Sequence, residues 1–116
     1  MKRQEAEPAG RMAEDTAAAY FEARGWRVLA RRRRTKLGEI DLVIRRPGLT
    51  AFVEVKWRRS AAVLGDAIDL PRLARVAAAA EAVAHEYAHE GDDLSVDVIL
   101  LAPGVAPRHI PNAWQP

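Results

Sequence analysis

Residues 38–44 read GEIDLVI and residues 52–57 read FVEVKW, and these two stretches decide the fold of this 116-residue chain. Both are short runs of β-branched and other apolar residues, which is typical of strands. Between them, Pro47 and Gly48 favour a tight turn, because proline pre-sets its φ for a corner and glycine accepts positive φ. The sequence therefore predicts a β-hairpin with its turn at residues 46–49.

Each of these strands carries charged residues two positions apart. Since side chains at i and i+2 share one face of a strand, Glu39 and Asp41 should lie together, as should Glu54 and Lys56. The opposite faces are expected to hold the apolar residues Ile40, Leu42 and Ile44 of the first strand and Val53, Val55 and Trp57 of the second. The hairpin therefore gathers three carboxylates and an ammonium group on an otherwise apolar sheet.

The pairing across the turn brings two of these carboxylates opposite each other. If Arg45 pairs with Thr50, Asp41 falls opposite Glu54, where like charges destabilise the sheet. A divalent cation between the two would relieve the repulsion, and Mg²⁺ is commonly bound through one or two carboxylates and its own waters. The alternative is a charged surface face on which Lys56 only screens two acids, and geometry alone leaves both interpretations open.

The two stretches resemble the signature of the YraN-like family, small bacterial proteins placed in the PD-(D/E)XK nuclease superfamily. Asp41 matches the lone Asp of that superfamily, and residues 54–56 match its E-x-K. Three flanking segments extend the resemblance over the chain from about residue 10: residues 10–15 (G-x-x-G-E, with Ala13 for the second Gly), 95–98 (R-F-D-V, with Ser95 for Arg) and 110–114 (I-x-N-A-aromatic).

This resemblance implies a restriction-endonuclease-like fold and a metal-dependent nuclease, or nuclease-like protein, acting on DNA phosphodiesters. In that case Asp41 and Glu54 would hold Mg²⁺ or Mn²⁺, with the carbonyl of Val55 as a further ligand. Lys56 would orient the attacking water or offset negative charge that develops on the phosphate. Glu39 and Glu14 are expected to be further catalytic acids, ranked after Asp41 and Glu54.

The remaining pattern predicts one α/β domain. A helix is expected over residues 11–24, a first strand over 26–33, a loop over 60–69, and a second helix from an N-cap at Asp69 to about Glu90. A strand over residues 94–101 follows, with a last short strand within 109–114. The order α-β-β-β-α-β predicts a sandwich of helices on a mixed sheet, with residues 10–116 as the domain and residues 1–9 as a disordered arm.

Composition narrows the classes of function. The chain has no cysteine, so it has neither disulfides nor thiolate metal sites. It has no apolar run of membrane-spanning length and no hydrophobic secretory segment near Met1, so we expect a cytoplasmic protein without a membrane partner.

Basic residues concentrate in the first half of the chain, around the acidic hairpin. Such a patch attracts phosphate backbones without reading sequence. We expect nucleic acid, which the family resemblance indicates is DNA, to contact Arg32, Arg34, Lys36, Arg58 and Arg59, with Arg31 and Arg33 on the other face of a regular strand. The alternatives are a solvated face and a nucleic-acid-binding module without catalysis, although the latter leaves the acids unexplained.

A rival motif is HEYAH at residues 85–89, which matches the H-E-x-x-H pattern of zinc peptidases. On a helix, His85 and His89 would share a face and bind zinc, with Glu86 beside them to activate water. The motif lies in the last predicted turns of its helix and lacks a third ligand at a recognisable spacing. A polar helix end is the simpler interpretation, and a zinc hydrolase is the less favoured alternative.

Overall fold

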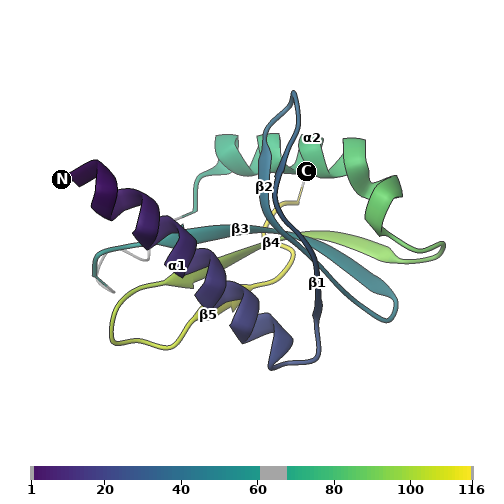
Figure 1. Ribbon diagram of the computed structural model, residues 1–116. Coiled ribbons are helices and arrows are strands. Elements are labelled where there is room, and N and C mark those ends of the chain that lie inside the picture. Colours follow the sequence, from purple (N-terminus) through teal and green to yellow (C-terminus); the bar gives the residue numbers. More distant parts are fainter. Residues whose placement is uncertain (1, 61–67, 116) are drawn as a thin grey trace.

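A five-stranded sheet lies between two helices in the computed structural model, which describes residues 2–60 and 68–115, with side chains from Gly10 onward (Figure 1). The elements are α1 (Lys2–Glu22), β1 (Arg27–Arg34), β2 (Glu39–Arg46), β3 (Leu49–Trp57), α2 (Leu70–Tyr87), β4 (Asp93–Leu101) and β5 (Arg108–Ile110). The α/β class and the order of elements are confirmed. Residues 61–67 of the predicted loop lie outside the described residues.

The sheet is mixed, as predicted. Its strands lie in the order β1-β2-β3-β4-β5, and only β3 and β4 are parallel. Parallel neighbours need a crossover, and the connection from β3 to β4 contains α2. This topology places the strand that carries the E-x-K residues at the centre of the sheet.

The hairpin between β2 and β3 has the predicted register. Arg45 pairs with Thr50 and Arg46 with Leu49, so the turn is tight, and Gly48 adopts a φ of +85°. Residues with side chains avoid this conformation, which explains glycine at this corner. The ladder then continues as far as Leu42 and Val53, which leaves Asp41 and Glu54 just beyond its last pair.

The strand β2 bends where the ladder with β3 ends. Leu42 and Ile44 belong to the apolar cluster under α1, whereas Ile40 belongs to the cluster under α2. The expectation that these three residues share one face is therefore wrong. The cause is the bend: Arg32 on the neighbouring strand has a φ of +51°, and the far end of the β1–β2 pair rises away from β3 beside α2 (Figure 1).

The helix limits differ from the predicted ones at three ends. Helix α1 begins at Lys2 rather than at Arg11, so its backbone includes residues expected to form an arm, and it ends at Glu22. Helix α2 begins as predicted, because the Asp69 side chain accepts the backbone N–H of Arg72 at 3.1 Å. It ends at Tyr87, before the expected Glu90, with Ala88 as its C-cap.

Two apolar clusters cover the two faces of the sheet. Phe52 on β3 packs with Leu73 and Val76 of α2, whereas Val53 packs with residues of α1 such as Phe21. Strand residues alternate between faces, so Glu54 and Lys56 lie on the side of α2 and Val55 on the side of α1. Neither helix is long and apolar enough to cross a membrane, over the part of the chain that the structure describes.

Candidate functional site

Glu54 is the most deeply buried acid of the candidate site, with 2% of its surface exposed. Its Oε1 atom accepts a hydrogen bond from Nε of Arg72, in the first turn of α2. Its Oε2 atom lies 3.8 Å from Nζ of Lys56, which is too far for a hydrogen bond, and it has no hydrogen-bond partner among the described residues. Buried polar atoms are usually satisfied, so this oxygen marks the site as incomplete.

Lys56 lies on the same face of β3, two residues after Glu54. It is almost fully buried, which is unusual for lysine unless a carboxylate lies nearby. The prediction that Glu54 and Lys56 lie on one face of the strand is therefore confirmed. At 3.8 Å, the Lys56 ammonium group leaves the hydrogen-bonding capacity of the buried Oε2 atom unused.

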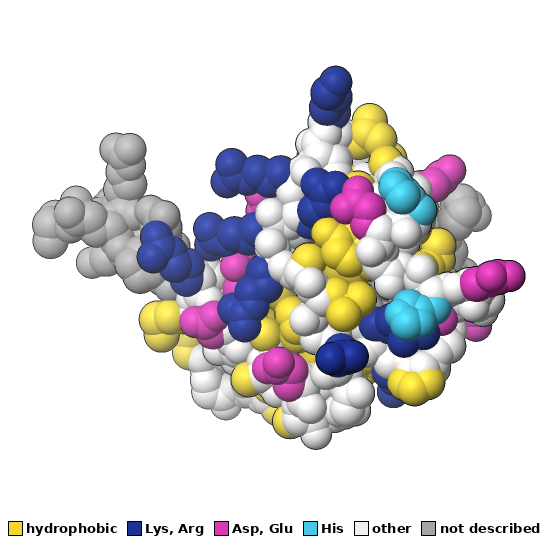
Figure 2. Space-filling view, turned by 45° about the vertical axis from the view of Figure 1, so that its right-hand side comes forward, with side chains coloured by type: hydrophobic (Ala, Val, Ile, Leu, Met, Phe, Trp, Pro, Cys, Tyr) yellow, Lys and Arg dark blue, Asp and Glu magenta, His cyan; other side chains and the backbone are white. Residues whose placement is uncertain are grey.

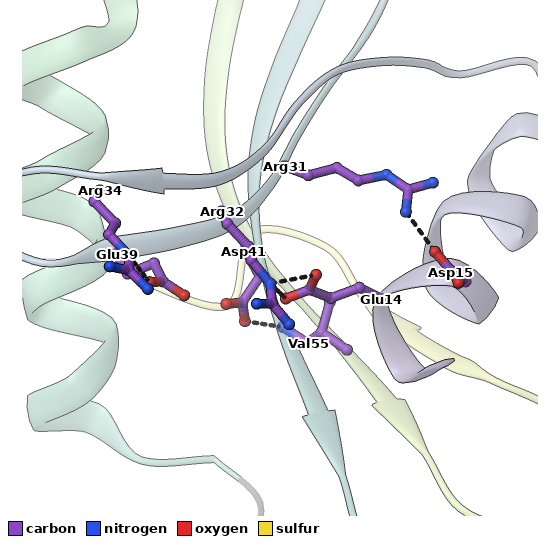
Figure 3. Close-up of polar contacts among 8 residues, drawn as sticks. All are labelled: Glu14, Asp15, Arg31, Arg32, Arg34, Glu39, Asp41 and Val55. Atoms are coloured by element: carbon purple, nitrogen blue, oxygen red, sulfur yellow. Dashed lines mark hydrogen bonds and ion pairs between the residues drawn. The ribbon is translucent and has the colours of Figure 1, made fainter. Parts of the chain in front are cut away.

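Asp41 lies at the bend of β2, and its Oδ2 atom accepts the backbone N–H of Val55 at 2.8 Å (Figure 3). The carboxylate thus takes the place of a ladder hydrogen bond where β2 leaves β3. Burial, opposed by the hydrogen bond from Val55 and assisted by the neighbouring charges of Glu54, Glu14 and Glu39, raises the pKa of Asp41 to about 6. The acids of the hairpin therefore repel one another, as the sequence predicted.

The two other predicted acids are held by arginines of β1. Glu14 on α1 receives Nε of Arg32 at 2.8 and 3.0 Å, and Glu39 receives Nε of Arg34 at 3.1 Å (Figure 3). Glu14 projects from the helix toward Asp41, whereas Glu39 lies farther along β2 (Figure 3). The structure thus places Glu14 at the edge of the site and pairs both acids with cations.

Hard oxygen donors are what this site offers to a metal. Asp41 and Glu54 supply two carboxylates. Val55, which lies between Glu54 and Lys56, supplies a backbone carbonyl oxygen. No group of three or more His, Asp and Glu side chains with metal-binding spacing occurs in the portion of the chain described. This donor set fits Mg²⁺, which keeps several waters and completes its coordination with substrate phosphate, and the unpartnered Oε2 of Glu54 is a donor available for it.

The run of arginines on β1 does not alternate between two faces. Arg31 reaches Asp15 of α1 at 2.6 Å and Arg33 reaches Glu86 of α2 at 2.8 Å, while Arg32 also reaches α1. The expected division into Arg32 and Arg34 against Arg31 and Arg33 is wrong, because the positive φ of Arg32 breaks the strand alternation.

The other predicted phosphate-binding residues remain on the surface. The Arg34 side chain is 80% exposed despite its contact with Glu39, and Lys36 and Arg59 are also exposed. Arg58 is half-buried and donates to the carbonyl of Trp57 at 2.9 Å. Figure 2 shows most Lys and Arg side chains at the left and top of the visible face and others lower down, with acidic side chains among them.

The HEYAH segment does not have the geometry of a zinc site. Helix α2 ends at Tyr87, so His89 lies beyond the helix that carries His85. Glu86 forms an ion pair with Arg33, and the backbone N–H of His89 binds Asp92 at 3.0 Å. The premise that both histidines share one helix face is therefore wrong.

Two features of the structure were missed by sequence reasoning. Arg72 belongs to no motif. The one unusual feature of its position is a positive charge in the first turn of a helix, where the helix dipole disfavours cations. Asp97 lies in a segment singled out for family likeness alone. It is 1% exposed, and it binds Nε2 of His109 at 2.7 Å and the backbone N–H of Asn112 at 3.0 Å.

Comparison with known proteins places the chain in a family. The model of the uncharacterised protein family UPF0102 matches residues 13–101. A UPF0102 protein of Erythrobacter litoralis is 62% identical over 116 residues and one of Sphingopyxis alaskensis is 52% identical over 116 residues, each covering 100% of both chains. A third, from Rhizorhabdus wittichii, is 45% identical over 113 residues, or 97% of this chain and 96% of the relative. The chain therefore belongs to the UPF0102 family, which is the YraN-like family indicated by its motifs.

Proposed function

We propose that the protein is a metal-dependent nuclease, or a nuclease-like protein, that acts on DNA phosphodiesters through Asp41, Glu54 and Lys56. One observation carries the proposal: Oε2 of Glu54 is buried and has no hydrogen-bond partner in the described structure. Leaving such an atom unpaired costs ~1–3 kcal/mol, and more when the group is charged. A divalent cation would satisfy it, and the resemblance of the hairpin to the PD-(D/E)XK signature supports both this chemistry and a restriction-endonuclease-like fold.

The electrostatics of the acids support the same reading. Asp41 has a raised pKa because it is buried near other carboxylates, so its charged form is disfavoured in the protein alone. A cation bound between Asp41 and Glu54 would favour the charged form of both. A module that only binds nucleic acid would have no use for this arrangement, because buried carboxylates repel phosphate.

Each residue has a role in the proposed reaction. Asp41, Glu54 and the carbonyl of Val55 would hold Mg²⁺ or Mn²⁺, which lowers the pKa of a bound water and stabilises charge on a phosphate. Lys56 lies on the same strand face as Glu54, where its ammonium group would hold the attacking water and offset the negative charge of the transition state. Glu14, beside Asp41, is the further acid best placed to influence the water.

The surface around the site supports DNA as the substrate. Arg34, Lys36 and Arg59 are exposed, flank the acidic hairpin in the sequence, and would contact phosphates of the duplex without reading its sequence. Arg58 donates to the backbone carbonyl of Trp57, and Arg32 is held by Glu14. These two would have to exchange those contacts for phosphate on binding, so we assign them a smaller part of the affinity.

The proposal is tested by metal binding and cleavage measured on the same variants. Asp41→Asn and Glu54→Gln should each weaken Mn²⁺ binding in calorimetry by at least tenfold and abolish cleavage of a panel of duplex, branched and single-stranded DNAs. Lys56→Met should retain Mn²⁺ binding and lower the cleavage rate by about 10²–10⁴-fold, the usual contribution of a positioned acid–base group. Glu81→Gln, an exposed acid on α2, is the matched control. Wild-type Mn²⁺ affinity in the double variant of Asp41 and Glu54 would place the metal elsewhere.

A further inference from the structure

Arg72 stands between the candidate site and solvent. Its backbone N–H binds the Asp69 cap of α2, which fixes the start of the side chain, and its Nε atom donates to Glu54. The Arg72 side chain is 52% exposed, whereas that of Glu54 is 2% exposed. One end of this ion pair is therefore sealed in the protein and the other is open to exchange.

The charges of the site balance only because Arg72 is present. Two carboxylates, Asp41 and Glu54, face two cations, Lys56 and Arg72. A buried carboxylate without a paired cation is strongly unfavourable. Arg72 therefore supplies, in the protein alone, part of the positive charge that a divalent cation would supply.

A bound cation and Arg72 would need the same carboxylate. The unpartnered Oε2 of Glu54 would bind the cation while Oε1 holds the guanidinium, so the cation and Arg72 would lie on one carboxylate as two like charges. Adding a doubly charged ion beside two existing cations also leaves an excess of positive charge. Releasing Arg72 lowers that repulsion and frees a guanidinium, which binds phosphate well because its donors match phosphate oxygens.

Space for the released side chain exists next to the pair. Arg72 lines a cleft of about 180 Å³ together with Gly38, Glu39 and Arg75. The cleft lies between the start of β2 and the first turns of α2, on the same side of the sheet as Glu54. A phosphate entering there would meet Arg72, while the carboxylate of Glu39 on the same cleft is already paired with Arg34.

We propose that Arg72 is an exchangeable counter-ion: it pairs with Glu54 in the metal-free protein, yields that carboxylate to the divalent cation, and then binds the substrate phosphate. This inference rests on the proposed metal-dependent function and adds a substrate-binding residue and an order of events to it. Metal and DNA binding become coupled, because the cation releases the arginine that DNA requires. Such coupling must be reciprocal.

The first test measures Mn²⁺ affinity by calorimetry in the absence of DNA. Arg72→Ala removes the competitor for Glu54, so Mn²⁺ should bind about tenfold more tightly than to wild type, the scale of one charge-assisted hydrogen bond. Arg75→Ala is the matched control, because Arg75 lies one turn later on α2 and has no contact with Glu54 within the described residues. Its Mn²⁺ affinity should equal that of wild type.

The second test reads Arg72 directly by NMR. The Nε–H resonance of Arg72 should show a hydrogen-bonded shift and slow solvent exchange without metal, and it should lose both when Mg²⁺ is added. With Ca²⁺ present, DNA binding by Arg72→Ala should be weaker than wild type, and its slope of log affinity against log salt should fall by about 0.9, the value for one phosphate contact. Arg72→Lys should restore part of this loss, because lysine keeps the charge.

The outcomes separate this inference from the proposed function. If wild type binds Mn²⁺ and Arg72→Ala binds it equally well, or if Mg²⁺ leaves the Nε–H resonance unchanged, the exchange is refuted and the metal site stands. If wild type binds no divalent cation at all, the proposed function fails and the exchange fails with it. Tighter Mn²⁺ binding with an unchanged DNA affinity would support the counter-ion and refute the phosphate contact.

Discussion

Two buried carboxylates lie on neighbouring strands in the centre of the sheet and differ in how many of their oxygens are hydrogen-bonded. Val53 pairs with Asp97 and Glu54 pairs with Val98, so the two acids are one residue apart in the ladder and point to opposite faces. Asp97, on the face of α1, has both oxygens bound, by His109 and by the backbone of Asn112. Glu54, on the face of α2, has one oxygen bound and one without a partner among the described residues.

The difference separates a structural acid from a candidate for chemistry. Both are at least 98% hidden from solvent, so burial alone does not distinguish them. Asp97 links β4 to β5 and to the chain after β5 through hydrogen bonds to both of its carboxylate oxygens. Glu54 is held by a half-exposed arginine and a lysine beyond hydrogen-bond distance. The useful criterion is therefore how completely the hydrogen-bonding capacity of a buried acid is used.

The largest effect should come from breaking the satisfied acid. Asp97→Asn places an amide against the donors of His109 and Asn112, so one buried donor loses its acceptor, and the free energy of unfolding should fall by about 3 kcal/mol. Glu54→Gln should cost clearly less, because Arg72 can turn to solvent. Urea unfolding of both variants measures this, and equal losses would mean that Glu54 is as structural as Asp97.

A smaller, pH-dependent effect should mark the unsatisfied side. The pKa of Asp41 is raised to about 6 from an ordinary value of 3.8, so the folded state retains a proton that the unfolded state loses first. The contribution of Asp41 to stability is therefore full below about pH 4 and is lost as pH rises through 6. Between pH 4 and 7, wild type should lose on the order of 2 kcal/mol relative to Asp41→Asn. Urea unfolding across this range tests the sign, and parallel curves for the two proteins would contradict it.

The smallest effect concerns the arginines of β1. The same contrast appears there, because Arg34 is 80% exposed beside Glu39, whereas Arg33 is 31% exposed and held by Glu86. Arg34→Ala should lower the slope of log DNA affinity against log salt by about 0.9, the value for one phosphate. Arg33→Ala should change it much less. Fluorescence anisotropy over a salt series decides between them, and a larger change for Arg33 would reverse the assignment.

The sequence was informative wherever a local rule determined the structure. The turn at Pro47 and Gly48 fixed the register of the hairpin, and Asp69 was identified as the cap of α2 because capping depends only on neighbouring residues. The grouping of Glu54 with Lys56 followed from strand periodicity in the same way. These features needed no knowledge of the rest of the chain.

The sequence failed where distant segments decide the outcome. The bend at Asp41 arises where β2 leaves β3, so periodicity predicted the wrong face for Ile40. The partners of the β1 arginines lie on both helices, and Arg72 reaches Glu54 across the chain. The ion pairs of these long side chains depend on how the helices pack on the sheet. Residue spacing in the sequence does not predict that packing.

The parallel pairing of β3 with β4 also has a consequence for how the molecule is assembled. The β2–β3 hairpin closes over a tight turn, but Leu49 meets Asp93 only after the chain has passed through α2. Closing a long loop costs conformational entropy before any contact repays it, so such pairings slow folding relative to local ones. The second neighbour of β3 is therefore the contact with the highest entropic barrier in the sheet. The crossover that delays this contact contains α2, whose Arg72 pairs with Glu54, so the charge of Glu54 is desolvated only when α2 packs on the sheet.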